Sequence, residues 1–328
     1  MTLASIHANQ TTTRPTQTQT QTHTRPYRIL MHRLKMTPLR TLANRLLLSI
    51  GVALLLLSGC SSMRLAYNTA DFFIGRYADD YLGLDGSQME RWSPTLDAAL
   101  ARHREQELPY LAAFFNSAQN EARKGFTEAG VGCLLDQFEV IYRRHFTLAA
   151  ETAAPLLAGL DQRQIDALEQ SFRKEAREDA PDNSPTSAAQ RQRKRAKRYE
   201  DNMQWWIGDL SEAQRVIVRE VTTAMPKTDT WYAYRDAKRE ELIRLLRSGA
   251  SVQRIERFLT DWVVDYRDMP ASLRLAQAEL RKGFTDLLVR LDASLTKEQR
   301  RHFIERLVRL RSDFMALQHN ERMAPVGC

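Results

Sequence analysis

Apolar side chains recur along this chain mainly at helical spacing. One stripe falls at i, i+4, i+7 and i+11 and comprises Phe303, Leu307, Leu310 and Phe314. Another falls at i, i+3, i+7, i+10 and i+14 and comprises Val252, Ile255, Leu259, Trp262 and Tyr266. Each stripe gives a helix one apolar face and one charged face, as in a helix bundle. Because no stretch alternates with period two between turn residues, we predict an all-α fold, a multi-helix bundle.

Four segments share a helix-start pattern, Leu-[Asp/Ser/Thr]-x-x-Gln. They are Leu84–Gln88, Leu160–Gln164, Leu210–Gln214 and Leu295–Gln299. In a capping box, the Asp, Ser or Thr oxygen accepts from the backbone N–H three residues on, and the Gln side chain reaches back to the cap residue. We therefore expect a helix to begin at each of the four segments.

Prolines mark further boundaries. Pro109 lies inside a helical pattern and should start or kink a helix, and Pro226 and Pro270 are expected at helix junctions. The stretch "EDAPDNSPTSAAQ" has the composition of a linker. We predict a linker at 179–190 between an N-terminal helical half, 60–178, and a C-terminal half, 191–328.

A short apolar run, Leu46–Leu57, precedes the first of the three cysteines. It is too short to span a bilayer, which takes about 20 apolar residues, and it follows Arg40 and Arg45 as in a signal peptide. The next residues complete "LSGC", which resembles a bacterial lipobox. The resemblance implies cleavage between Gly59 and Cys60 and lipidation of the Cys60 thiol. It also implies export to the outer membrane, because Ser61 replaces the Asp that commonly retains lipoproteins in the inner membrane.

The first 35 residues differ in kind from the rest. The segment "QTTTRPTQTQTQTHTRP" is polar and repetitive, so we predict that 1–35 is disordered. A leader counted from Met1 is longer than the usual length of about 15–30 residues. We expect translation to start at Met36 or Met31, with 36–59 as the signal peptide.

The net charge of +8 belongs to the leader. Residues 1–59 hold seven basic and no acidic residues, so the remaining 269 residues carry 41 basic and 40 acidic ones. This near balance argues against nucleic acid as a partner.

Cys133 and Cys328 remain once Cys60 is lipidated. The periplasm permits disulfides, so the two are candidates for a disulfide, with two free thiols as the alternative.

The run "RQRKRAKR" is the densest positive charge in the chain. Its six basic residues are Arg191, Arg193, Lys194, Arg195, Lys197 and Arg198. They are candidates for contact with anionic lipid headgroups, lipopolysaccharide or peptidoglycan, and the alternative is a solvated helix start.

The sequence carries no GxSxG, P-loop, HExxH, CxxC or GxGxxG motif. We therefore expect no catalytic residues, no metal site and no cofactor.

Two families resemble this chain. The lipobox, the stretch Leu65–Asp71, the Asp79–Tyr81 triplet and the later "RYEDNMQWWIGDLSEAQ" are similar to a family of uncharacterised helical lipoproteins of proteobacteria. That resemblance implies localisation and fold but no activity. Leu295–Gln299 also resembles the Leu-Thr-x-x-Gln motif of periplasmic chaperones of the Spy and CpxP type.

Three functions remain open. The first is a non-catalytic, lipid-anchored protein of the outer membrane that faces the periplasm and binds or scaffolds an envelope protein, in a chaperone-like way. The second is an envelope enzyme, or enzyme subunit, acting on cell wall or lipid. The third is a lipoprotein that binds anionic polymers. The first predicts an exposed concave apolar surface.

Overall fold

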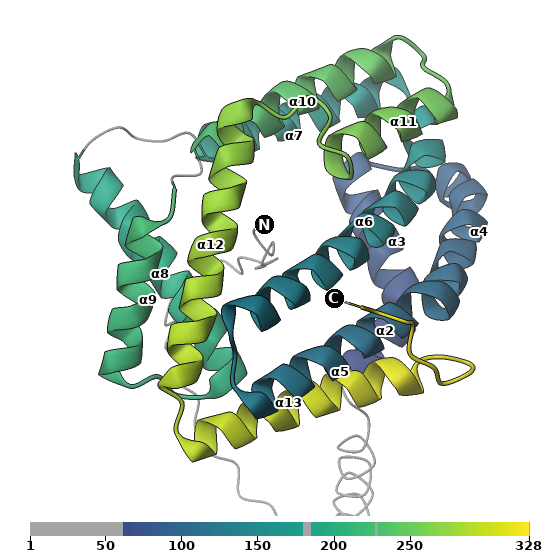
Figure 1. The fold of residues 1–328 in the computed structure, drawn as a ribbon. Coiled ribbons are helices and arrows are strands. Elements are labelled where there is room, and N and C mark those ends of the chain that lie inside the picture. The colour runs from purple at the N-terminus through teal and green to yellow at the C-terminus, as the bar shows by residue number, and fades with distance from the viewer. Residues whose placement is uncertain (1–61, 180–184, 227–228, 328) are drawn as a thin grey trace, which may run out of the picture. The chain divides into compact units, whose positions relative to one another are not determined.

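The computed structural model describes residues 62–179, 185–226 and 229–327 (Figure 1). Helices dominate these residues and no strand occurs among them, so the predicted all-α fold is confirmed. The helices, in chain order, are α2 (Ser62–Asn68), α3 (Ala70–Leu82), α4 (Gly86–Arg102), the π-helix η1 (His103–Glu107), α5 (Leu108–Lys124), α6 (Glu128–Ala158), α7 (Gln162–Asp179), α8 (Pro185–Ile207), α9 (Glu212–Ala224), α10 (Asp229–Arg247), α11 (Val252–Val263), α12 (Ala271–Ala293) and α13 (Lys297–Ala316). None of the helices in the described part is long and apolar enough to cross a membrane.

The two predicted halves pack against each other, because residues 62–328 form one compact unit. Helix α13 lies along α5, α11 along α6, and α10 along α7 (Figure 1). Helices α7 and α8 together occupy Asp179 and 185–190 of the predicted linker, while 180–184 lie outside the described residues. Proline is tolerated in the first turn of a helix, where its missing N–H has no partner to lose, so Pro185 can open α8.

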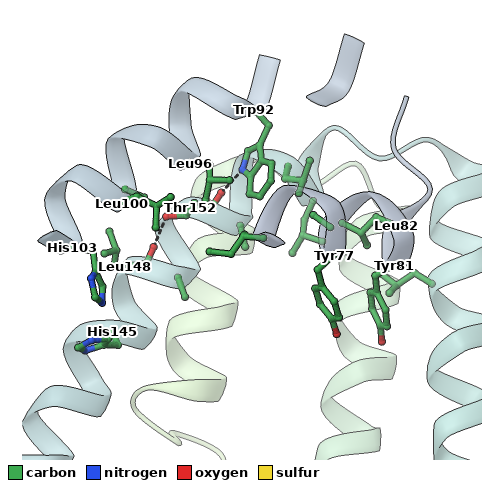
Figure 2. A pocket seen from close by; sticks show the side chains of 18 of the residues that line it. Tyr77, Tyr81, Leu82, Trp92, Leu96, Leu100, His103, His145, Leu148 and Thr152 are labelled. Carbon is green, nitrogen blue, oxygen red and sulfur yellow. Dashed lines mark hydrogen bonds between the residues drawn. The ribbon is translucent and has the colours of Figure 1, made fainter. Parts of the chain in front are cut away.

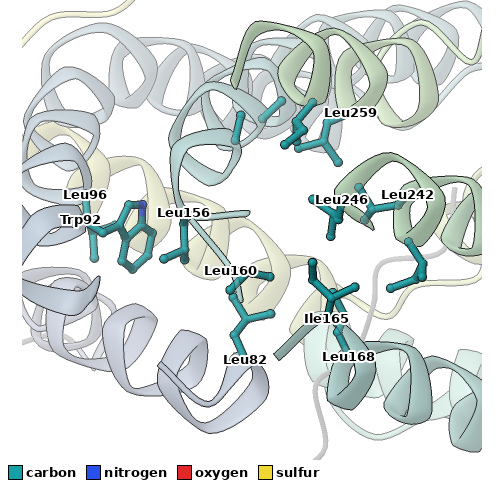
Figure 3. Close-up of a cluster of buried hydrophobic side chains, with 14 residues drawn as sticks. Leu82, Trp92, Leu96, Leu156, Leu160, Ile165, Leu168, Leu242, Leu246 and Leu259 are labelled. Atoms are coloured by element: carbon teal, nitrogen blue, oxygen red, sulfur yellow. The ribbon is translucent and has the colours of Figure 1, made fainter. Parts of the chain in front are cut away.

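Several separate apolar clusters hold the helices together. The largest draws on α3, α4, α6, α7, α10 and α11, and its side chains include Trp92, Leu168 and Leu259 (Figure 3). A second lies between α8, α9 and α12 around Val218 and Leu287. Because the largest cluster combines side chains of α3, α4, α6 and α7 with those of α10 and α11, it joins helices from both halves of the chain.

All four predicted capping boxes are present. The side chains of Asp85, Asp161, Ser211 and Thr296 accept from the backbone N–H of the Gln three residues on, and each Gln Oε1 accepts from the backbone N–H of its cap residue. The local pattern therefore predicts these four helix starts correctly.

The four glutamines also pair with one another, two by two. Gln88 Nε2 lies 2.9 Å from Gln164 Oε1, and Gln164 Nε2 lies 2.7 Å from Gln88 Oε1. The same amides donate to the carbonyls that end the opposite helices, Gln88 to Gly159 and Gln164 to Gly83. Each glutamine thus caps its own helix and holds the end of another.

The second pair repeats this arrangement. Gln214 and Gln299 exchange two amide hydrogen bonds of 3.0 Å. Gln214 donates to the Ser294 carbonyl and Gln299 to the Asp209 carbonyl. Because both pairs join one helix–turn–helix corner to another, the same device fixes two places in the fold.

The proline expectations are also confirmed. Pro109 lies at the start of α5, Pro226 falls between α9 and α10, and Pro270 is the N-cap of α12. The stripe that runs to Tyr266 is too long, because α11 ends at Val263. Tyr266 has a φ of 48° and lies in the following turn.

Candidate functional site

An apolar pocket lies beside the largest cluster and has a volume of about 440 Å³. Its walls come from α3, α4, η1, α6 and α7, with Leu242 of α10. Figure 2 shows His103 and His145 at one end and Tyr77 and Tyr81 at the other. This volume falls in the range of about 300–1,000 Å³ that is typical of ligand sites.

Two helices supply most of the wall through simple periodicity. On α4 and η1 the lining residues Trp92, Leu96, Leu100 and His103 follow one helical face. On α6 the lining residues recur at i, i+3, i+4 and i+7 and comprise His145, Leu148, Ala149, Thr152, Ala153, Leu156 and Leu157. Apolar side chains from these two faces therefore cover much of the pocket surface.

Three polar groups of the pocket wall are already hydrogen-bonded within the protein. Trp92 Nε1 donates to the Thr152 carbonyl at 2.9 Å, and Thr152 Oγ1 donates to the Leu148 carbonyl at 2.7 Å (Figure 2). Tyr81 OH donates to Glu175 at 3.1 Å. Burial, together with the Glu175 carboxylate, raises the pKa of the Tyr81 hydroxyl. Apart from the Tyr77 hydroxyl and the Nε2 atoms of the two histidines, the wall therefore offers shape and apolar surface.

Two histidines from distant parts of the chain meet at one end of the pocket. The rings of His103 and His145 are 4.7 Å apart, centroid to centroid, and nearly perpendicular. His103 Nδ1 shares a 2.8 Å hydrogen bond with Tyr67 OH, and His145 Nδ1 lies 2.7 Å from the Ile141 carbonyl oxygen. Burial, with smaller effects from His145 and Arg104, lowers the pKa of His103 to about 4. His103 is thus neutral at neutral pH.

The π-helical turn that carries His103 follows from Pro109. Proline lacks a backbone N–H and its ring clashes with the carbonyl of residue i−4, here Glu105. The chain widens into η1, where the Leu108 N–H donates to the His103 carbonyl. Arg322 donates to the Glu105 carbonyl at 3.0 Å and so occupies it. Such turns are frequent at functional sites.

A buried ion pair stabilises the other end of this turn. Glu107 is 2% exposed, and Arg144 donates to both of its carboxylate oxygens at 2.7 and 2.9 Å. Arg144 also lies over the Tyr110 ring. These contacts join η1 to α6 next to the two histidines.

The rim of the pocket on α3 is exposed. Ile74 and Tyr77 line the pocket and are 40% and 64% exposed. Tyr77 stacks on Tyr81 with a centroid distance of 5.7 Å. The pocket therefore opens to solvent past two apolar or aromatic side chains.

None of the described residues that the sequence nominated as sites lines this pocket. Gly59, Cys60 and Cys328 are outside the described residues. Cys133 is disulfide-bonded and accepts a hydrogen bond from Gln137, but its pairing with Cys328 stays a prediction.

The basic run lies on α8 and does not line the pocket. Arg195 donates to the Met225 carbonyl at the end of α9, and Lys197 pairs with Asp201 at 2.6 Å. Arg191 is partly buried. Four of the six, Arg193, Lys194, Lys197 and Arg198, line one surface hollow.

The pocket itself was missed from the sequence. His103 and His145 are 42 residues apart, and no motif joins them. The apolar wall positions have the same spacing as core positions, so periodicity alone does not separate a wall from a core. Within the described residues, no three His, Cys, Asp or Glu side chains gather as a metal site would require.

Comparison with known proteins gives a family without a function. The chain belongs to a family of unknown function, DUF6279, whose model matches residues 80–267, more than half of the chain. No curated protein and no solved structure matches it. The match contains Gln88, Gln164 and both histidines, whereas the rim residues Ile74 and Tyr77 precede it. The expected membership of an uncharacterised family is confirmed, and the lipoprotein and proteobacterial features stay predictions.

Proposed function

We propose that this protein is a non-catalytic lipoprotein that binds apolar segments of other envelope proteins in its pocket, as a chaperone or scaffold does. The anchor is the lipid on Cys60, and the body faces the periplasm from the outer membrane. The observation that carries the binding role is a 440 Å³ pocket with an almost wholly apolar wall and an open aromatic rim. Such a surface gains free energy when it covers apolar groups of a partner.

The chemistry of the wall favours binding over reaction. The hydrogen-bonding groups of Trp92, Thr152 and Tyr81 are used inside the protein, and His103 contacts Tyr67. A reactive site needs a nucleophile or an acid–base pair aimed at one point in a cleft. The pocket therefore gives the alternative of an envelope enzyme little support.

A pocket-filling substitution tests the proposal. Ala149 lines the pocket and is exposed, so Ala149→Trp should fill it without disturbing the buried core. Ala129→Trp on the same helix is the control, because Ala129 is exposed and outside the pocket. The assay measures suppression of aggregation of reduced, denatured α-lactalbumin, together with binding of the apolar dye N-phenyl-1-naphthylamine.

We expect Ala149→Trp to weaken both activities about tenfold or more, since one buried aromatic side chain replaces the apolar surface offered to the ligand. Ala129→Trp should leave both unchanged. Equal activity of the two variants, or no effect of the parent protein at excess, would refute the proposal.

The basic surface of α8 supports a second role. Arg193, Lys194 and Arg198 are exposed and make no ion pair with any residue in the described part of the chain. Their charges are thus available to anionic headgroups or cell-wall polymers. If this role holds, Arg193→Glu/Lys194→Glu should no longer pellet with peptidoglycan or lipopolysaccharide. Pelleting that persists would remove it.

A further inference from the structure

Exposed apolar side chains concentrate in one short segment. Among the described residues, eleven large apolar side chains are exposed, and five of them fall between positions 65 and 77: Leu65, Phe72, Phe73, Ile74 and Tyr77. Phe72 and Phe73 are 66% and 60% exposed. Isolated exposed apolar residues need no explanation, but such a concentration marks an interaction surface.

Three of these residues share one face of α3. The rings of Phe72 and Phe73 are 5.4 Å apart, and Tyr77 follows on the same exposed side, whereas Gly75 and Leu82 are on the buried side. We call Leu65, Phe72, Phe73 and Tyr77 the N-terminal aromatic face. Arg76 lies between them in the sequence, and its charge is paired with Asp80.

The preceding helix is fixed firmly to the body. Arg64 pairs with Asp313 of α13 at 2.8 Å, Tyr67 OH bonds His103, and Arg104 donates to Asn68 at 3.0 Å. Tyr67 also packs against the cluster around Leu108. These contacts hold α2 in place, and Leu65 remains 59% exposed beside them.

The position of the face in the sequence indicates what covers it. Two peptide units join Cys60 to Ser62, and they span at most about 7 Å. Leu65 lies three residues further, about 5 Å along α2, and Phe73, in the first turn of α3, lies at most about 17 Å beyond Ser62. A lipid on Cys60 therefore keeps the whole face within reach of the headgroup layer, where apolar faces of helices insert about 5–10 Å.

We propose that the N-terminal aromatic face docks on the surface of the membrane that holds the lipid anchor. The proposal rests on the proposed anchor at Cys60. The lipid and the face make two contacts with one bilayer, so the body keeps a fixed orientation. Ile74 and Tyr77 then bring the rim of the pocket to the bilayer surface.

Charge does not drive this contact. Helices α2 and α3 carry two basic residues, Arg64 and Arg76, and three acidic ones, Asp71, Asp79 and Asp80. Binding should therefore occur on zwitterionic lipid and resist added salt. A contact made by the basic surface of α8 would instead require anionic lipid and weaken in salt.

The experiment uses residues 62–328 without lipid, which form a compact unit of their own. Flotation with phosphatidylcholine vesicles compares the parent protein with Phe72→Ser/Phe73→Ser. Leu275→Ser is the control, because Leu275 is 70% exposed on a different helix, α12. We expect the double variant to lower vesicle binding about tenfold or more, with salt without effect. The control should bind like the parent, and all three should melt alike.

Three outcomes would overturn the proposal. They are no binding of the parent protein, equal binding by the double variant, and a concentration-dependent dimer that the double variant abolishes. The dimer would show that a second copy covers the face. Palmitate labelling of the full chain and its Cys60→Ala variant tests the anchor separately. If the full chain takes up no palmitate while residues 62–328 still bind vesicles, the anchor is rejected and the membrane contact of the face is retained.

Discussion

The paired glutamines allow a sharp test of how the helix corners are joined. Gln164 is 4% exposed, and its amide contacts the Gly83 carbonyl, the Gln88 side chain and the Asp161 N–H. Gln164→Met keeps the length and removes every one of these hydrogen bonds. The buried Gln88 amide loses a partner, whereas the exposed Gly83 carbonyl can turn to water. We expect the free energy of unfolding to fall by about 2–4 kcal/mol.

Coupling between the glutamines distinguishes a pair from two independent caps. Once Gln164 is replaced, the Gln88 side chain has already lost its hydrogen bonds to Gln164. Gln88→Met should therefore lower the free energy of unfolding by about 1–3 kcal/mol less in the Gln164→Met background than in the parent protein. Gln164→Met and Gln214→Met share no hydrogen bond and should add to within about 0.5 kcal/mol.

Urea unfolding of residues 62–328, followed by circular dichroism, measures the coupling of Gln88 and Gln164 in a double-mutant cycle. The control cycle combines Gln164→Met with Gln214→Met. Additive costs for Gln88 and Gln164 would show that each glutamine only caps its own helix, and would refute the paired arrangement.

Three further predictions concern single groups. The pKa of His103 is about 4 in the folded protein and 6.5 in the unfolded chain, so between these pH values only the unfolded chain binds the proton. The free energy of unfolding should therefore fall by up to about 3 kcal/mol as the pH drops from 6.5 to 4. His103→Asn should flatten the profile of melting temperature against pH. Arg144→Met strands the buried Glu107 carboxylate and should cost about 3–5 kcal/mol in urea unfolding, part of which Glu107→Gln recovers; a cost below about 1 kcal/mol would contradict the burial. Gly83 has a φ of 61° and open space where the methyl group of an alanine would lie, so Gly83→Ala should cost only about 1 kcal/mol, from backbone strain, and a larger loss on thermal unfolding would mean a steric clash.

Local patterns predicted local structure well in this protein. The Leu-[Asp/Ser/Thr]-x-x-Gln pattern located four helix starts because a capping box depends on residues only three apart. The pairing of Gln88 with Gln164 involves positions 76 apart, and the capping pattern is the same with or without a partner. The sequence therefore predicts that each glutamine caps its own helix, but not that it pairs with a second glutamine.

Identical local sequences also folded differently. "RKGFT" at 123–127 ends α5, with Gly125 at a φ of 93°, and gives the N-cap of α6. At 281–285 the same letters lie inside α12, where Gly283 approaches Met225. Packing against neighbouring helices decides which of the two structures the segment adopts. That packing involves residues far away in the sequence, so the segment's own sequence does not predict it.

The candidate site was hidden for a similar reason. A periodic stripe predicts that Leu96 and Leu148 face inward, but the space left between two stripes depends on how closely the helices approach. The π-helical turn at His103 is partly foreseeable from Pro109, whereas its contact with His145 is not. Sequence patterns thus predicted the helices and left their mutual geometry open.

Site-specific photocrosslinking in cells tests the pocket most directly. A photoreactive amino acid at position 149 lies in the pocket, and one at position 129 lies on the same helix outside it. We expect crosslinks to other envelope proteins from position 149 that are absent from position 129 and diminished in the Cys60→Ala form. The same products from both positions, or none from position 149, would contradict a binding role for this pocket.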